Sequence, residues 1–357
     1  MGDADRSAVL AERVREAIAD ATALQLRGSG SKDFLGHAAN GVPLDLRDHA
    51  GIVRYAPDEL VLTARAGTPL AQIEAALAEH GQMLGFEPPH HGAGATLGGT
   101  LAAGLSGPRR ASAGAARDFV LGVRVLDGRG QVLRFGGEVI KNVAGYDVAR
   151  LMVGAFGTLG AILEASLRLV PRPRAERTLA LELDADAALE RLRDWSQRPL
   201  PISASAIDGG RLHLRLSGAD AAVRAAASEI GGETVGDGAR LWHSLREQTH
   251  AFFADPRPLW RLSVAPATPL ADLGGPQLVE WQGAQRWLTS DADPARLRAA
   301  AAAGGGHATR FRAGADGTAV EHVFHPLPPP MLALHRRLKA EFDPHGLFNR
   351  GRLYPEL

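Results

Sequence analysis

The residues best suited to binding chemistry lie in a glycine-rich segment, PPHHGAGATLGGTLAAGLSG, at 88–107. Almost no bulky side chain separates its glycines, so the backbone itself is the expected working surface. Successive peptide N–H groups freed by small residues form concave anion sites. A shorter loop, Arg27-Gly28-Ser29-Gly30-Ser31-Lys32, has a similar composition, although ordinary turns also use glycine and serine. Together the two segments predict a site for a phosphate-bearing ligand, with a diphosphate cofactor as the first candidate.

A second polar run lies at 141–147 and reads Lys141-Asn142-Val143-Ala144-Gly145-Tyr146-Asp147. It places an amine, an amide and a phenol within a few residues of each other. Gly154, Gly157 and Gly160 follow and surround Thr158. A solvated lysine and a buried tyrosine with a satisfied hydroxyl would explain this run equally well. The residue types alone therefore leave its role open.

Histidines offer two weaker candidates. His90 and His91 adjoin the glycine run, but two adjacent residues seldom face one site, so a surface pair is the favoured interpretation. Glu321, His322 and His325 would suit a metal ion if they lay on a helix. Prolines at 326, 328, 329 and 330 follow at once and argue against a helix. No metal site is expected.

Composition removes several classes of function. The 357 residues include no cysteine, which excludes disulfides, thiolate metal ligands, iron–sulfur clusters and cysteinyl–flavin links. Forty basic and forty acidic residues cancel, so nothing favours nucleic acid as a partner. The charged N-terminus lacks the apolar core of a signal peptide, and no apolar run is long enough for a transmembrane segment. A cytoplasmic protein is expected, with peripheral attachment to a membrane complex left open.

The elements that must position these residues form an α+β unit. Leu60–Ala66 reads as a strand, and Thr68–His80 as a helix with Thr68 as its N-cap and Pro69 at its first position. Asp127-Gly128-Arg129-Gly130 reads as a hairpin turn between two strands. Further helices are expected at 8–19 and 148–153, and further strands at 24–26, 44–46, 51–55, 119–126, 131–135 and 161–170.

The sequence pattern changes after Pro171 and Pro173, which look like a domain boundary. From residue 178 the expected order is β-α-β-β-α-β, the ferredoxin-like arrangement. A looser second round follows, with helices at 241–253 and 294–303 and strands at 260–264, 278–282 and 285–288. Residues 331–342 then form an expected C-terminal helix before the tail. The segment 174–325 is therefore interpreted as one cap domain.

Four signals, in this order along the chain, resemble the flavoproteins of the vanillyl-alcohol oxidase/p-cresol methylhydroxylase (PCMH) superfamily. Within it the chain is most similar to the family of FAD-binding subunits of bacterial glycolate oxidase. The signals are Arg27-Gly28-Ser29-Gly30-Ser31, Ala95-Thr96-Leu97-Gly98-Gly99, the run at 141–147, and the tail Phe342-Asp343-Pro344 with Leu347-Phe348-Asn349. The resemblance implies an α+β fold: a two-subdomain PCMH-type FAD-binding domain at 1–173, a ferredoxin-like α+β cap at 174–325, and a C-terminal helix and tail at 326–357 returning to the FAD domain.

The resemblance also implies a set of cofactor contacts. The two glycine loops would hold the FAD diphosphate, and the remaining positions would lie near the flavin or adenine ends. Carried over residue by residue, these contacts are Arg27, Gly28, Ser29, Gly30, Ser31, Gly94, Thr96, Gly98, Gly99, Asp118, Lys141, Asn142, Gly145, Tyr146, Gly157 and Gly160. Ser31 stands where some relatives carry a flavin-linked histidine, so non-covalent FAD is expected.

The implied function is the FAD-binding subunit of a multi-subunit 2-hydroxy-acid dehydrogenase, which converts glycolate to glyoxylate and passes electrons to partner subunits. The implied partners are a second, catalytic FAD-containing subunit and an iron–sulfur subunit, with a 2-hydroxy acid as the small-molecule substrate. The cap lacks the metal and base motif H-x-G-D-G-N-x-H found in catalytic relatives, so the catalytic residues stay unknown. A stand-alone FAD oxidoreductase and a non-catalytic scaffold of the same fold are the alternatives.

Overall fold

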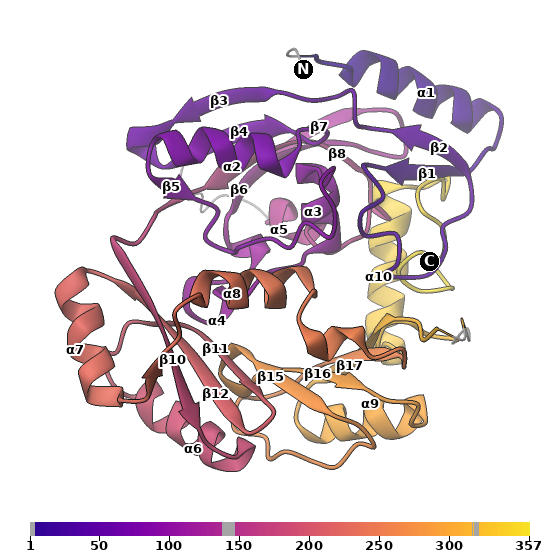
Figure 1. Cartoon of the computed structure of the whole chain (residues 1–357). Helices are drawn as coiled ribbons and strands as arrows, with labels where there is room; N and C mark the ends of the chain where they lie inside the picture. The colour runs from indigo at the N-terminus through magenta and orange to yellow at the C-terminus, as the bar shows by residue number, and fades with distance from the viewer. Residues whose placement is uncertain (1–3, 138–146, 316, 318–320) are drawn as a thin grey trace. The chain divides into compact units, whose positions relative to one another are not determined.

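The computed structural model describes residues 4–137, 147–315, 317 and 321–357 (Figure 1). Backbone contacts divide the chain into two compact units. Unit 1 comprises Met1–Ser106, Ala115–Pro171 and Pro326–Leu357, and unit 2 comprises Gly107–Gly114 and Arg172–His325. Each unit is therefore assembled from segments that lie far apart in the sequence. The FAD-type glycine loops and the C-terminal tail both belong to unit 1.

The larger sheet of unit 1 has five strands in the order β3-β4-β8-β6-β7, and every neighbouring pair is antiparallel. The strands are β3 (Ile52–Ala56), β4 (Val61–Arg65), β6 (Val120–Leu126), β7 (Val132–Gly136) and β8 (Ala161–Arg168). All of β8 except its last residue is buried, which is expected for a central strand covered on both faces. Two short strands, β5 (Gln82–Met83) and β9 (Val170–Pro171), pair beside it.

A second, two-stranded parallel sheet pairs β1 (Leu24–Arg27) with β2 (Val42–Asp45). The helix α1 (Ser7–Ala19) packs its apolar stripe against this sheet, because Leu10 and Val14 share a buried cluster with Leu24, Leu44 and Phe348. The C-terminal tail therefore contributes to the core between α1 and this two-stranded sheet. The backbone N–H of Leu24 also donates to the Leu347 oxygen at 2.8 Å.

Unit 1 contains further helices and 3-10 turns among its described residues. They are α2 (Leu70–Glu79), α3 (Leu97–Ala103), α5 (Val148–Met152), α10 (Pro329–Phe342), and the 3-10 turns η1 (Pro57–Glu59) and η2 (Ala116–Asp118). The helix α2 begins two residues later than expected, and Pro69 occupies its N-cap. Thr68 is not the cap: its hydroxyl accepts from the Gly51 N–H at 2.9 Å and donates to the Gly51 oxygen at 3.1 Å. A tertiary contact has outcompeted the local capping bond.

Unit 2 is built on one eight-stranded sheet with the order β13-β10-β12-β11-β15-β16-β14-β17. Its first half contains β10 (Ala175–Glu182), α6 (Ala185–Ser196), β11 (Ile202–Asp208), β12 (Arg211–Gly218), α7 (Asp220–Ile230) and β13 (Glu233–Thr234). The strand order 4-1-3-2 and the helix positions make this half ferredoxin-like, as the sequence predicts.

The second half repeats the arrangement in reverse along the sheet. Its strands are β14 (Leu259–Ser263), β15 (Gln277–Glu280), β16 (Gln285–Thr289) and β17 (His307–Arg312), and α9 (Pro294–Ala303) connects the last two. Their order, 2-3-1-4, mirrors that of the first half, and β11 and β15 join the halves. No helix lies between β14 and β15 in this fully described stretch. The remaining elements of unit 2 are the helices α4 (Arg110–Ala113) and α8 (Gly238–Glu247) and the 3-10 turns η3 (Ala251–Ala254) and η4 (Trp281–Gly283).

Three helices cover one face of this sheet. Figure 1 shows α6, α7 and α9 on the same side of the sheet. Their apolar side chains pack on that face in three buried clusters, which include Leu192 from α6, Val223 from α7 and Leu297 from α9. The opposite face carries Arg215, Glu280 and Trp287, because side chains alternate along each strand. The helix-covered face is therefore the core, and the other face is polar and aromatic.

Candidate functional site

A cavity lies within unit 1, bounded on one side by the start of α3. Its walls come from β1 and the loop that follows it, from α3 with its N-cap, from the 152–162 segment, and from the C-terminal tail. Of the predicted cofactor contacts, ten line it: Arg27, Gly28, Ser29, Gly30, Ser31, Thr96, Gly98, Gly99, Gly157 and Gly160. Residues separated by more than a hundred positions in the sequence thus meet around one space.

The other predicted contacts lie elsewhere. Gly94 is not in the cavity wall; a Cβ atom there would lie 3.3 Å from the Ser29 Cβ. Asp118 is also outside the wall, where its carboxylate accepts from the Ala115 N–H at 2.9 Å and pairs with Arg150 at 3.4 Å. The remaining four, Lys141, Asn142, Gly145 and Tyr146, fall outside the described residues.

The first glycine loop offers unused backbone donors. The amides of Ser29 and Gly30 make no hydrogen bond to any described residue, and both residues line the cavity. Gly30 has a φ of +79°, a conformation that glycine adopts without strain. Successive free N–H groups at a tight turn form the type of nest that binds a phosphate oxygen. This loop fits the diphosphate of a dinucleotide cofactor.

The second glycine segment has a different role. Thr96 caps α3, and its hydroxyl accepts from the Gly99 N–H at 3.3 Å. The Gly98 N–H donates to the Ala66 oxygen at 2.8 Å, so both glycine amides are already used. A Cβ at Gly28 would lie 2.6 Å from the Thr96 hydroxyl oxygen, and one at Gly98 would lie 2.6 Å from the Ala66 Cβ. In this segment the role of glycine is to allow close packing between segments, because its backbone N–H groups are not free to bind a ligand.

Three basic residues line the cavity: Arg27, Lys32 and Arg352. Arg27 was a predicted cofactor contact and Lys32 ends the loop predicted to bind phosphate, whereas Arg352 was not predicted. The Lys32 ammonium is buried beside the Ser31 hydroxyl at 3.3 Å and the His90 oxygen at 3.1 Å. Arg352 donates to the His37 oxygen at 2.8 Å, and burial lowers its pKa although Asp33 opposes that shift. These cations can balance the charge of a bound diphosphate.

The C-terminal tail fixes the cavity walls. Asn349 lines the cavity, accepts from the Leu26 N–H at 2.8 Å and donates to the Phe156 oxygen at 2.6 Å. It thereby joins β1 to the 155–160 loop. A Cβ at Gly157 would lie 2.8 Å from the Asn349 amide nitrogen, so glycine is needed for this close approach. The sequence signal that points to Asn349 is the tail motif Leu347-Phe348-Asn349, which is one of the four signals that carry the family resemblance.

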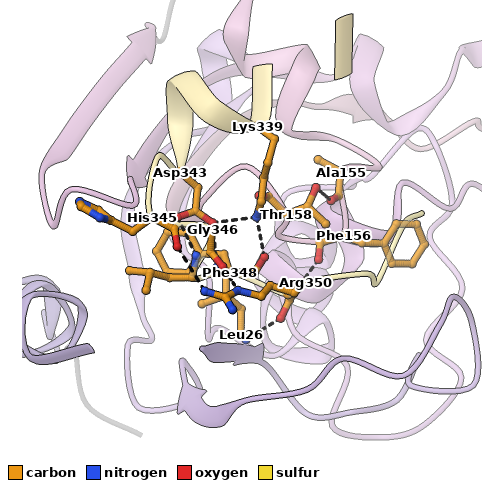
Figure 2. A network of polar contacts seen from close by, with 12 residues as sticks. Leu26, Ala155, Phe156, Thr158, Lys339, Asp343, His345, Gly346, Phe348 and Arg350 are labelled. Atoms are coloured by element: carbon orange, nitrogen blue, oxygen red, sulfur yellow. Dashed lines mark hydrogen bonds and ion pairs between the residues drawn. The ribbon is translucent and has the colours of Figure 1, made fainter. Parts of the chain in front are cut away.

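A buried ion pair anchors the tail in turn (Figure 2). The Lys339 ammonium donates to the Asp343 carboxylate, the Thr158 oxygen and the Phe348 oxygen, each at 2.7 Å. Asp343 also accepts from the N–H groups of Leu347 and Phe348 at 2.9 and 2.8 Å. Burial lowers the pKa of Lys339, and Asp343 opposes that shift. This fully satisfied network holds the tail against the cavity loop.

A metal centre is not evident: among the described residues, no group of three or more histidine, aspartate or glutamate side chains could hold an ion. Glu321, His322 and His325 lie in a non-helical segment. In the part of the chain that the structure describes, no helix is both long and apolar enough to cross a membrane.

The fold and the cavity define a class of protein, the PCMH-type FAD-binding flavoproteins, in which an FAD domain is joined to an α+β domain. Residues 5–136 match the family described as FAD binding domain. The solved structure of alkyldihydroxyacetonephosphate synthase shares the fold, with a TM-score of 0.63 at 16% identity over 95% of this chain and 73% of the other. The fold and the FAD-binding domain expected from the sequence are confirmed.

Sequence relatives narrow the class. The chain is 49% identical over 355 residues to glycolate oxidase subunit GlcE of Escherichia coli (strain K12), covering 99% of both proteins. It therefore belongs to the glycolate oxidase subunit GlcE family. Glycolate oxidase subunit GlcD of Bacillus subtilis (strain 168) is 43% identical over 100 residues, which are 28% of this chain and 21% of GlcD. The likeness to GlcD thus covers a limited part of both proteins.

Proposed function

We propose that this chain is the FAD-binding subunit of a multi-subunit complex that oxidises glycolate to glyoxylate, and that FAD occupies the cavity of unit 1. The cavity carries the proposal, because it combines two free amides, three basic side chains and glycine-lined walls in one FAD-binding domain. The name of the E. coli relative, glycolate oxidase subunit GlcE, supplies the substrate. Bound FAD supplies the two-electron oxidation of a C–OH group.

Different residues of the cavity would contact different parts of the cofactor. The Ser29 and Gly30 amides would hold phosphate oxygens, with Lys32 and Arg352 neutralising charge. Met152, Ala155 and Ala161 offer apolar surface for a ring system. The predicted roles of Gly94, Asp118, Lys141, Asn142, Gly145 and Tyr146 near the flavin or adenine ends stay part of this proposal.

The cofactor would be held without a covalent bond. Covalent flavins are attached through nucleophilic side chains, and no histidine, cysteine or tyrosine is among the described residues that line the cavity. Ser31 lies in the wall at the position where the family resemblance places a flavin-linked histidine in some relatives. Acid precipitation of the purified protein should therefore release all of the flavin into the supernatant; yellow colour kept in the pellet would contradict a non-covalent mode.

The complex would include a second, FAD-containing subunit and an iron–sulfur subunit. The word subunit in the names of both relatives supports an assembly, and the chain has no cysteine with which to ligate a cluster of its own. Electrons from glycolate would then leave through a partner chain. We place this complex in the cytoplasm, peripheral to the inner membrane.

The decisive experiment is purification of the full chain alone and after co-expression with its partner subunits, scoring bound FAD, co-purified chains and glycolate-dependent dye reduction. We expect flavin absorbance in both samples and turnover in the complex. Lys32→Met should lower FAD affinity, whereas Arg13→Met, a substitution on the exposed side of α1, should not. A chain that fails to bind added FAD would refute the cofactor proposal. Full turnover by the isolated chain would favour a stand-alone oxidoreductase.

A further inference from the structure

The helix α10 buries almost none of its own side chains. Of its 14 residues only Lys339 is buried, and that side chain is charged. A surface helix of a globular protein normally packs an apolar stripe against the core, and this packing supplies most of its stability. Met331 and Leu334 are instead each 45% exposed, and Leu338 is half-buried. The helix therefore presents apolar side chains outward instead of to the core of unit 1.

These side chains belong to one continuous band, the α10 band, which consists of Phe135, Met331, Leu334, Leu338 and Phe342. Positions three and four apart lie on the same face of a helix, so the four members on α10 form a single row. The Phe342 ring meets the Phe135 ring of β7 edge-on, with 6.1 Å between the centroids. The strand β7 is the last of its sheet. None of the five side chains is buried, and a contiguous apolar patch of this kind marks an interaction surface.

The α10 band is carried by a pre-organised element. Pro328 is the N-cap of α10, and Pro329 and Pro330 take its first two positions, where the fixed φ of proline suits a helix. At the other end, the Phe342 oxygen accepts from the Gly128 N–H at 2.8 Å. The buried ion pair of the tail fixes the same end of the helix. A partner would therefore not have to order this helix on binding, which lowers the cost of association.

The charges beside the band are positive. Arg336 and Arg337 are exposed, and neither makes an ion pair or a side-chain hydrogen bond with a residue that the structure describes. Glu341, the one glutamate in the sequence of α10, already pairs with Arg129 at 3.7 Å. Arg337 is a neighbour of Leu334 on the helix surface, because the two are three residues apart. The band therefore complements a surface whose apolar centre is bordered by carboxylates.

The α10 band also lies near the proposed cofactor cavity. On an adjoining side of the helix, the Lys339 ammonium donates to the Thr158 oxygen at 2.7 Å. Thr158 stands between Gly157 and Gly160, which both line the cavity. A protein docked on the band would thus be separated from the cavity loop by a single helix. This place suits an electron-accepting partner, because electron transfer between redox centres is fast only over short distances.

We propose that the α10 band is the docking surface for the iron–sulfur subunit of the complex, which would receive it in an apolar groove with a carboxylate border. Met331, Leu334 and Leu338 would be the anchors, at the i, i+3 and i+7 spacing of helix-in-groove recognition. A membrane surface suits the helix less well, because helices that lie on membranes have a strongly basic polar face and that of α10 includes Glu341. The band is a property of unit 1 alone, whereas the identity of the partner rests on the proposed function.

The test is co-expression of the full chain with both partner subunits, followed by purification through a tag on this chain and measurement of co-purified chains, iron and FAD. The double variant Met331→Glu, Leu334→Glu should retain about tenfold less iron–sulfur subunit, because it places unpaired charges at two anchors and repels the acidic border. Its FAD content should match that of the wild type. Val9→Glu and Val53→Glu add the same charge at exposed valines of α1 and β3 and should assemble normally. Arg337→Glu should weaken assembly most at low salt.

Wild-type amounts of the iron–sulfur subunit on the double variant, or an equal loss with the valine variants, would overturn the proposal. Loss of only the second flavin subunit would also overturn it. So would a dimer of the isolated chain, or its sedimentation with phosphatidylglycerol vesicles, that the double variant abolishes, because the band would then serve a second copy or a membrane.

Two further controls keep the result interpretable. If the double variant does not fold, which loss of FAD would show, Leu334→Ser removes one anchor without adding a charge and should still reduce the co-purified iron–sulfur subunit. A wild-type chain that binds FAD but retains neither partner would refute the proposed assembly and this docking partner together. Normal assembly of the variants would refute the docking surface alone.

Discussion

Replacing Asn349 with alanine tests whether the C-terminal tail shapes the cofactor cavity. The Asn349 side chain is 5% exposed and makes two hydrogen bonds, from the Leu26 N–H at 2.8 Å and to the Phe156 oxygen at 2.6 Å. Removing it leaves one donor and one acceptor without partners. At about 1–3 kcal/mol for each unsatisfied group, and with both groups only partly buried, the free energy of unfolding should fall by about 2–4 kcal/mol.

The backbone conformation adds a second term. Asn349 has a φ of +42°, in the left-handed region that asparagine tolerates better than alanine. An alanine there should cost about 1 kcal/mol more than a glycine. The variant Asn349→Gly therefore isolates the hydrogen bonds from the strain. Asn349→Asp keeps the acceptor for Leu26 but places a carboxylate against the Phe156 oxygen, so it should fall between the wild type and alanine.

The assay is urea unfolding of the flavin-free chain, followed by FAD titration of the same variants under native conditions. Because β1 and the 155–160 loop both line the cavity, we expect Asn349→Ala to weaken FAD binding by about tenfold or more, equivalent to about 1.4 kcal/mol. Asn40→Ala, at an exposed asparagine of the same unit, is the matched control. Unfolding free energy and FAD affinity both within the error of the wild type would refute the role of the tail.

Three further predictions concern stability. Lys339→Met should lower the free energy of unfolding by about 3–5 kcal/mol in urea, because it leaves the buried Asp343 carboxylate without its cation; an effect no larger than that of the exposed control Arg336→Met would contradict this. Gly98→Ala should cost about 1–3 kcal/mol through the clash with Ala66, whereas Gly236→Ala, which meets nothing within 4 Å, should be nearly neutral in the same assay. Buried His49 accepts the Arg6 N–H through Nδ1 at 2.9 Å, and its pKa lies below 6.5 because of burial, so the unfolded chain binds the proton first and stability should fall as pH drops below 6.5. His49→Gln should flatten that slope in urea unfolding at several pH values, and an unchanged slope would assign the pH dependence to other groups.

Local pattern was sufficient for much of the fold. The alternating strands, α1 and the ferredoxin-like order of the first half of unit 2 all follow from periodicity and turn residues. The helix α3 was not predicted, because glycine has low helix propensity and two glycines stand near its start. Its formation depends on the Thr96 cap and on the close approach of Gly98 to Ala66, a contact between segments that local propensity does not describe.

The cavity was only partly predictable for a related reason. Loop residues such as Ser29 and Gly30 have a composition that indicates anion binding. Asn349 and Arg352 reach the same cavity only because the last residues of the chain return to β1, where Leu24 bonds to Leu347. A lysine or arginine has no local pattern that distinguishes such a position from a solvated one. Identifying these residues from the sequence would have required knowing that the C-terminal tail pairs with β1.

The two glycine segments look alike in sequence, yet the structure separates their tasks. In the 96–99 segment both glycine amides are used internally and glycine allows close packing, so substitution there should act first on stability. In the 28–31 loop the Ser29 and Gly30 amides stay available, so perturbation of this loop should act first on cofactor affinity. Measuring both quantities for Gly98→Ala and for Lys32→Met, which removes the cation next to that loop, would separate packing from binding. Equal ratios of the two effects in both variants would mean that the cavity responds as one unit and that this division of tasks is wrong.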